Sequence, residues 1–109
     1  MLKVKPEYID EYRELHAAVW PDMLRAIRDA GWSRYTIFMR EDGTVVGYLE
    51  SDDLATARER IDRFEVSQRW GEATAHLFQE TQEWLQPIFN LDEQLFAIDE
   101  RLDQSDPYL

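Results

Sequence analysis

Cysteine is absent from this 109-residue chain and histidine occurs only twice, which excludes several kinds of chemistry. Without cysteine there can be no disulfide and no thiolate nucleophile. His16 and His76 alone cannot form a histidine-rich metal site. No apolar run approaches the roughly 20 residues of a membrane-spanning helix. The first residues, MLKVKP, are too short and too charged for a signal peptide, so we expect a cytoplasmic protein.

Positive charge is also scarce, with 12 basic against 23 acidic residues and a net charge of −11. Such a chain repels phosphate groups, so nucleic acids, anionic membranes and phosphorylated substrates are disfavoured as partners. The sequence lacks a glycine-rich phosphate loop, a GxSxG element and an HExxH element, so nucleotide-binding and hydrolase functions have no support. A small neutral ligand is the favoured partner.

Hydrophobic periodicity and turn residues predict a succession of strands and helices in one globular domain. We expect strands at 1–5, 35–40, 44–50 and 94–99, and helices at 6–20, 22–30, 54–63 and 67–78. Gly31 would cap the second helix, Asp42-Gly43 would form a hairpin turn, and Gly71 would lie in the first turn of the fourth helix. Residues 79–89 are ambiguous, and Pro87 interrupts them.

The order β-α-β-β-α-β predicts an α+β fold, the ferredoxin-like sandwich, over residues 1–100, followed by a tail at 101–109. Helices on one face of a four-stranded sheet leave the other face uncovered. In a chain this short, a second copy can cover that face, so the sequence predicts a homodimer whose sheets meet face to face, a dimeric α+β barrel.

Tyr12, His16 and Trp20 are spaced four residues apart, which places them on one face of the predicted first helix. Imidazole is suited to proton transfer near neutral pH. Two interpretations remain open for this face: it packs into the core, or it lines a pocket for a ligand rich in hydroxyl groups. Trp20, which precedes Pro21, is more typical of a packing residue at a bend.

Tyr35 and Trp70 are the other aromatic candidates. Tyr35 combines an apolar ring with a hydroxyl that needs a partner when buried. Trp70 precedes Gly71, so its indole could form an open platform on which a sugar ring stacks. His76 has no polar partner nearby in the sequence and is expected to be structural. The acidic residues of the first helix are expected to form its solvated face rather than a catalytic carboxylate pair.

Four stretches of the chain match a known family. They are EYRELHAAVWPD at 11–22, GWSRYTIF at 31–38, EDGTVVGYLE at 41–50 and VSQRW at 66–70. On these residues the chain resembles the L-rhamnose mutarotases over roughly residues 1–100. The HxxxWP element with its upstream tyrosine is the most specific part of the resemblance.

The resemblance implies a dimeric ferredoxin-like fold and an isomerase that interconverts the α and β anomers of L-rhamnose without a cofactor. It assigns His16 as the proton donor and Tyr12, Tyr35 and Trp70 as sugar-binding residues. Some family members carry a second tryptophan directly after Trp70, where this chain has Gly71. The first strand is a few residues shorter than in family members, which suggests a truncated start.

In anomer exchange, the ring oxygen gains a proton while the anomeric hydroxyl loses one. A side chain that gains and loses protons near neutral pH can assist these transfers, and neither a metal nor a covalent intermediate is needed. Three alternatives stay open. The chain could be a non-catalytic sugar-binding or structural module, a mutarotase for another 6-deoxy sugar such as L-fucose, or a cofactor-free monooxygenase of the same architecture.

Overall fold

The computed structural model describes residues 1–80 and 82–104, with side chains described up to residue 100. The strands are β1 (Leu2–Val4), β2 (Ser33–Met39), β3 (Thr44–Glu50) and β4 (Phe78–Glu80). The α-helices are α1 (Ile9–Ala17), α2 (Pro21–Asp29), α3 (Leu54–Arg63), α4 (Glu65–Thr74) and α5 (Leu91–Gln104). Two short 3₁₀ turns, η1 (Pro6–Tyr8) and η2 (Ala75–Leu77), precede α1 and β4.

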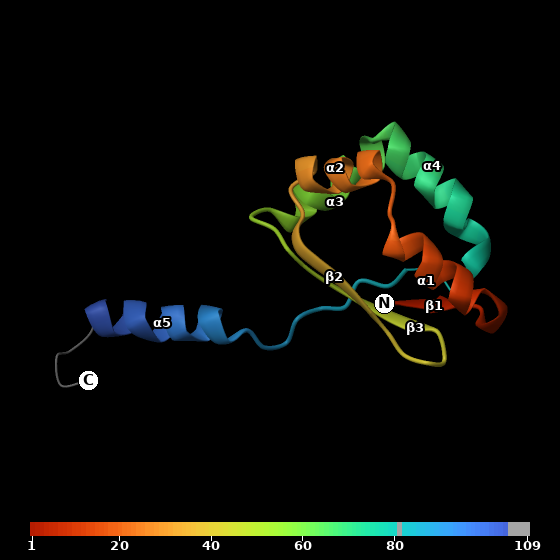
Figure 1. Ribbon diagram of the computed structural model, residues 1–109. Helices are drawn as coiled ribbons and strands as arrows, with labels where there is room; N and C mark the ends of the chain where they lie inside the picture. The colour runs from red at the N-terminus through yellow and green to blue at the C-terminus, as the bar shows by residue number, and fades with distance from the viewer. Residues whose placement is uncertain (81, 105–109) are drawn as a thin grey trace.

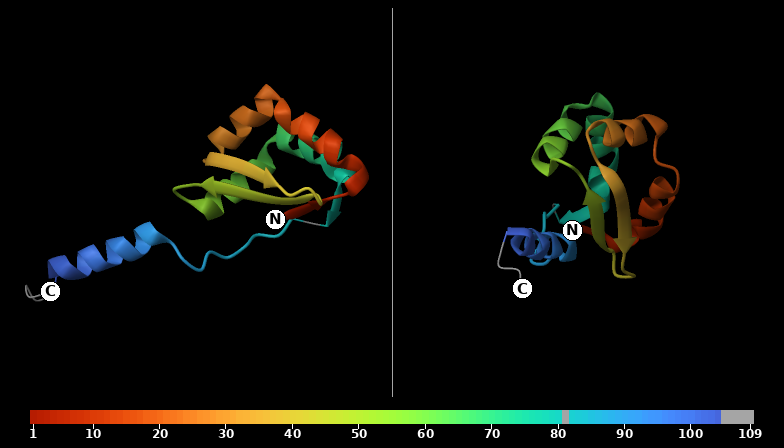
Figure 2. Two further views of the ribbon diagram at one scale, coloured as in Figure 1. Left: turned by 60° about the horizontal axis from the view of Figure 1, so that its bottom comes forward. Right: turned by 90° about the vertical axis from the view of Figure 1, so that its left-hand side faces the viewer.

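The four strands form one antiparallel sheet in the order β2-β3-β1-β4. Helices α1 to α4 lie over one face of this sheet, as Figures 1 and 2 show. The connectivity and the single helical layer confirm the predicted ferredoxin-like α+β fold. None of the helices in the described ranges is long and apolar enough to cross a membrane.

Local sequence signals explain the turns between these elements. Gly43 has a φ of +90°, and a Cβ at this position would lie 2.5 Å from the carbonyl oxygen of Val4, so the hairpin between β2 and β3 requires glycine. Asp53 caps α3, because its side chain accepts a hydrogen bond from the backbone N–H of Thr56 at 3.1 Å. Gly31 follows α2 with a φ of +100°, the left-handed cap that was predicted.

The core consists of two clusters of buried side chains. The first joins α1 to the sheet through Val4, Tyr12, Val45 and Leu77. The second joins α2 to α3 and consists of Met23, Ala26, Ala30 and Ile61. Helix α1 also faces β2, and a pocket opens between these two elements.

The predicted helix over residues 6–20 is shorter in the structure, because α1 ends at Ala17. Trp20 has an extended backbone, with φ −51° and ψ 131°, and is the N-cap residue of α2. A residue before proline avoids the helical region, whereas proline itself fits the first helical position. Tyr12 and His16 therefore share a helix face as predicted, but Trp20 does not belong to that helix.

Helix α4 also differs from its prediction at 67–78, since it begins at Glu65 and ends at Thr74. Phe78 starts β4 instead of closing the helix, so the fourth strand lies in residues 78–80. Gly71 consequently sits in the middle of α4 rather than in its first turn. An added Cβ at Gly71 would meet no atom within 4 Å.

The predicted last strand at 94–99 was wrong, because these residues belong to α5. The side-chain oxygen of Asn90 accepts the backbone N–H of Glu93 at 2.9 Å, which caps the helix, and acidic residues occupy its first turn. The alternation of apolar residues was therefore misread as a strand pattern. Helix α5 continues past residue 100, where the sequence predicts the end of the domain and the start of the tail at 101–109. The division into domain and tail stays a prediction, and residues 105–109 of the tail lie outside the described residues.

Candidate functional site

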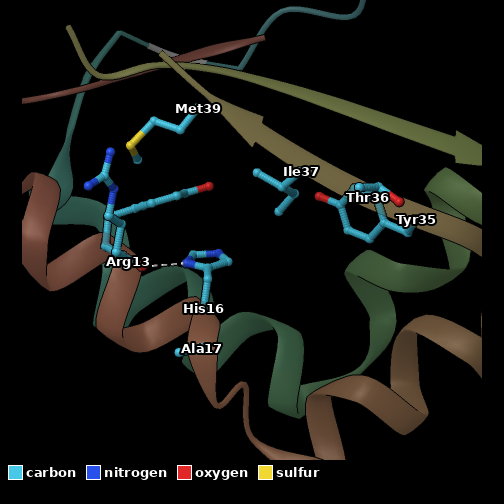
Figure 3. A pocket seen from close by; sticks show the side chains of 8 residues that line it. Arg13, His16, Ala17, Tyr35, Thr36, Ile37 and Met39 are labelled. Carbon is cyan, nitrogen blue, oxygen red and sulfur yellow. Dashed lines mark hydrogen bonds between the residues drawn. The ribbon is translucent and has the colours of Figure 1, made fainter. Parts of the chain in front are cut away.

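A pocket of about 480 Å³ opens between α1 and β2. Helix α1 and strand β2 contribute its walls, and Figure 3 shows the side chains that converge on it from these two elements. The lining residues are Tyr12, Arg13, His16, Ala17, Tyr35, Thr36, Ile37 and Met39. The volume lies within the range of about 300–1,000 Å³ that is typical of small-molecule sites. The pocket is therefore large enough for a monosaccharide.

His16 is held in a defined orientation by Tyr12, one helical turn earlier. The two rings stack with centroids 4.0 Å apart and an interplanar angle of 25°. Nδ1 of His16 lies 2.9 Å from the backbone carbonyl oxygen of Tyr12. Because a carbonyl oxygen only accepts hydrogen bonds, this contact assigns the proton of the neutral imidazole to Nδ1. Nε2 is then the nitrogen that can exchange a proton with a ligand.

The two pocket tyrosines are neutral hydrogen-bonding groups at physiological pH. Tyr12 is only 3% exposed, and its burial, with a smaller contribution from the nearby Tyr35, raises its pKa to about 12. Desolvation by the surrounding protein also raises the pKa of Tyr35, although 39% of this residue is exposed. Both phenols can therefore donate and accept hydrogen bonds, but neither supplies a phenolate base.

The position of Tyr35 depends on a glycine that sequence reasoning did not single out. Gly47 lies opposite Ile37 in β3, and a Cβ added to Gly47 would approach Cε1 of Tyr35 to 3.3 Å. The missing side chain therefore leaves room for the phenol ring. On its other side, Tyr35 contacts Trp32 edge to face with ring centroids 5.0 Å apart. No pattern in one sequence reveals this cross-strand contact.

Trp70 reaches the site from α4. Its indole contacts His16 edge to face at 5.5 Å between ring centroids, and Trp20 at 5.0 Å. A larger hollow of about 940 Å³ continues from the pocket, and Tyr12, His16, Tyr35 and Trp70 all line it. The structure thus brings the four predicted site residues around one space. Trp20 supports Trp70 from behind and packs against the α2 core cluster, which confirms its predicted packing role.

Two residues near the ligand space were missed in the sequence. Arg13 lines the pocket, although the charged pattern of its segment suggested only a solvated helix face. Trp84 comes from the ambiguous segment before α5 and lines the larger hollow, with its ring 6.0 Å from that of Trp32. An indole in a segment that Pro87 interrupts was the available signal for Trp84.

His76 lies outside the pocket, as a structural role requires, but the prediction that it lacks a polar partner was wrong. Its Nε2 lies 3.2 Å from Oε1 of Glu11, and its ring contacts that of Tyr8 edge to face at 5.2 Å. Within residues 1–80 and 82–104, no group of three or more histidine, aspartate or glutamate side chains is arranged to hold a metal ion.

The fold and the site define a class of protein: a ferredoxin-like α+β domain with a monosaccharide-sized pocket lined by aromatic rings and one imidazole. Within this class, the chain belongs to the L-rhamnose mutarotase family, whose model matches residues 1–97. Members of this family are isomerases that act on carbohydrates, so the pocket belongs to an enzyme of that kind.

Individual relatives agree with this assignment. An L-rhamnose mutarotase of Bacillus subtilis (strain 168) is 32% identical over 96 residues, which cover 82% of this chain and 91% of that protein. One from Pectobacterium carotovorum is 28% identical over 99 residues, covering 84% of this chain and 94% of the relative. A crystal structure of L-rhamnose mutarotase from Formosa agariphila matches this chain with a TM-score of 0.65 and 23% sequence identity. The match covers 83% of this chain and 92% of the Formosa agariphila chain, and it supports the fold.

Proposed function

We propose that this protein interconverts the α and β anomers of L-rhamnose, with His16 as the group that moves the proton. The observation that carries the proposal is the orientation of His16 in this chain, which belongs to a family of mutarotases. Its Nδ1 is tied to the Tyr12 carbonyl, which leaves Nε2 available in a sugar-sized pocket. A positioned imidazole is the side chain best suited to donate and accept protons near neutral pH.

In the proposed reaction, protonated His16 donates from Nε2 to the ring oxygen of the sugar while the anomeric hydroxyl loses its proton to water. The C1–O5 bond breaks and gives an open-chain aldehyde. Rotation about C1–C2 presents the other face of the carbonyl, and the ring closes as the protons return. The reaction consumes no cofactor, and proton transfer of this kind accelerates it by roughly 10²–10⁴-fold.

The aromatic residues bind and orient the sugar in this proposal. Tyr12 and Tyr35, whose pKa values burial raises still further above neutral pH, hydrogen-bond the sugar hydroxyls as neutral phenols. Trp70 provides an apolar wall for the C–H groups of the ring, since it lines the larger hollow beside His16. Apart from Arg13, the side chains that line the pocket between α1 and β2 carry no permanent charge, which suits a neutral monosaccharide.

We also propose that the protein works as a homodimer whose sheets meet through their uncovered faces. Phe38, Val46 and Tyr48 are exposed on the face opposite the helices, and Phe38 pairs with Val46 across β2 and β3. Apolar side chains that adjoin in this way form a patch suited to a second copy. Sedimentation at micromolar concentration tests the assembly, and a monomer there would contradict it. The cytoplasmic location stays a prediction.

Saturation-transfer NMR tests the activity directly. Irradiation of one anomeric proton of L-rhamnose should reduce the signal of the other anomer in proportion to the amount of protein. L-fucose and other aldoses, measured in the same way, identify the preferred sugar. Two results together would make the chain a sugar-binding module without activity. The anomers of every aldose would exchange no faster than in buffer, and L-rhamnose at millimolar concentration would raise the Tm of the protein. Its family membership leaves the monooxygenase alternative without support.

A further inference from the structure

The larger hollow extends the sugar-sized pocket and offers room beyond it. Its volume of about 940 Å³ is almost twice the 480 Å³ of the pocket, and Tyr12, His16 and Tyr35 line both spaces. Figure 3 shows His16 and Tyr35 on opposite walls of the shared part. The hollow is therefore a continuation of the proposed active site rather than a separate cavity, and a ligand held at His16 can extend into it.

Gly71 leaves space open where α4 lines the hollow. It directly follows Trp70, and a Cβ added to Gly71 would meet no atom within 4 Å. Neither tight packing nor a positive φ requires glycine at this position, although glycine in the middle of a helix is less stable than alanine. A side chain as large as tryptophan, which some family members carry here, would occupy this space. The glycine therefore widens the site beside Trp70.

Trp84 is an aromatic wall of the hollow that the protein holds in place. The guanidinium of Arg58 lies 4.0 Å from the centroid of its ring, and the ring of Trp32 meets it edge to face at 6.0 Å. The preceding residue, Glu83, exchanges two backbone hydrogen bonds with Met1, with N···O distances of 2.9 and 2.6 Å. The indole is thus oriented before a ligand binds, and its apolar surface can pack against the C–H groups of a sugar ring.

Polar side chains line the opening of the hollow. They come from α3, α4, the edge strand β4 and the segment after it, and all except the serine are exposed: Asp62, Ser67, Gln79, Glu80, Gln82 and Glu83. Carboxylate, hydroxyl and amide groups can hydrogen-bond sugar hydroxyls. Among the described residues that line the hollow there is no lysine or arginine, so phosphate and carboxylate groups are disfavoured there. The opening therefore suits a neutral ligand that carries several hydroxyl groups.

We propose that the protein also acts on disaccharides whose reducing residue is L-rhamnose, and that the second sugar residue occupies the part of the hollow that Gly71 leaves open and Trp84 lines. This inference rests on the mutarotase activity proposed above and extends its substrate class. The second residue is linked through a hydroxyl other than the anomeric one, because C1 of the reducing residue has to open. The reducing residue then meets His16 as L-rhamnose does, while the polar opening binds the hydroxyls of the second residue.

Two substitutions of the same glycine test where the second residue lies. Gly71→Trp fills the open space, whereas Gly71→Ala makes the same change of backbone preference and adds only one methyl group. We expect Gly71→Trp to raise the KM for the disaccharide about tenfold or more and to leave that for L-rhamnose within about twofold, and Gly71→Ala to leave both within about twofold. Trp84→Ala gives a second, independent check and should raise the KM for the disaccharide roughly threefold to tenfold, the effect of losing one aromatic contact. Equal effects on both sugars, or none, would overturn the assigned position.

Saturation-transfer NMR with rhamnosyl-rhamnoses linked 1→2, 1→3 and 1→4 tests the substrate class beside L-rhamnose. We expect the reducing-end anomers of at least one disaccharide to exchange with a KM roughly threefold to tenfold below that of L-rhamnose. If L-rhamnose exchanges and every disaccharide has a higher KM or exchanges no faster than in buffer, the second site is wrong while the proposed function stands. If no sugar exchanges, the proposed function is wrong, and titrations followed by tryptophan fluorescence decide the second site separately. Tighter binding of a disaccharide than of L-rhamnose supports it, and equal or weaker binding of all three overturns it.

Discussion

Replacing His16 by glutamine tests the proposed chemistry most directly. Glutamine can retain a hydrogen bond to the Tyr12 carbonyl, but it cannot deliver a proton at neutral pH. If His16 supplies general acid–base catalysis, kcat falls by roughly 10²–10⁴-fold, which raises the barrier by about 3–5 kcal/mol. KM changes less, because Tyr12, Tyr35 and Trp70 still line the sugar space.

The substitution also has a structural cost that the contacts of His16 allow us to bound. The imidazole stacks on Tyr12 and meets Trp70 edge to face, and aromatic contacts of this kind contribute about 0.5–1.5 kcal/mol each. The variant should therefore lose about 1–3 kcal/mol of stability. That loss is below the about 5–15 kcal/mol typical of a folded domain, so the protein should remain folded.

Saturation-transfer NMR on L-rhamnose gives the rate, and thermal unfolding confirms that the variant is folded. His76→Gln is the matched control, because it removes the other imidazole, which is exposed and paired with Glu11 outside the pocket. We expect His76→Gln to retain the original exchange rate. A folded His16→Gln protein that exchanges anomers as fast as this control would remove His16 from the mechanism.

Three further predictions concern two glycine positions and the hairpin turn. Gly47→Ala should raise KM several-fold by displacing Tyr35, whose Cε1 would lie 3.3 Å from the new Cβ, and an unchanged KM in kinetic measurements would refute this packing argument. Gly71→Ala should raise the free energy of unfolding by about 1 kcal/mol, because α4 has open space at this position, and thermal unfolding measures the change. Asp42 accepts hydrogen bonds from Thr44, first from its backbone N–H, which lowers the pKa of the carboxyl from 3.8 to about 2. The contribution of the Asp42 carboxylate to stability is therefore complete above about pH 4 and disappears as the pH falls through about 2. The difference in stability between the original chain and Asp42→Asn should shrink over that window in acid denaturation. A difference that stays constant with pH would contradict this role of Asp42.

Sequence reasoning was most successful where a local signal determines the backbone. The hairpin at Asp42-Gly43 and the cap at Gly31 each depend on one or two residues, and β3 and α3 have the predicted bounds. The four-residue spacing of Tyr12 and His16 also placed both side chains at one pocket. These features could be predicted because their causes lie within a few consecutive residues.

The errors occurred where distant contacts or competing local patterns decide the outcome. Phe78 could have extended a helix, but its pairing with Val4 makes it the start of β4. Residues 94–99 carry strand-forming side chains, yet the cap at Asn90 and the helical spacing of the apolar residues produce α5. The role of Gly47 is visible only once β2 and β3 are paired. A single sequence contains no direct record of such pairings.

The aromatic chain that runs from Trp20 to Tyr12 explains why Trp20 matters although it lies outside α1. Trp20 supports Trp70 edge to face, Trp70 meets His16 edge to face, and His16 stacks on Tyr12. The imidazole is thus held by a ring on each of two sides and by a carbonyl at Nδ1, which limits its rotation. A proton donor that is already oriented loses little freedom when the sugar binds, and such preorganisation lowers the barrier to transfer. The bend at Pro21 therefore contributes to the proposed catalysis indirectly, because it places the ring on which the chain of contacts rests.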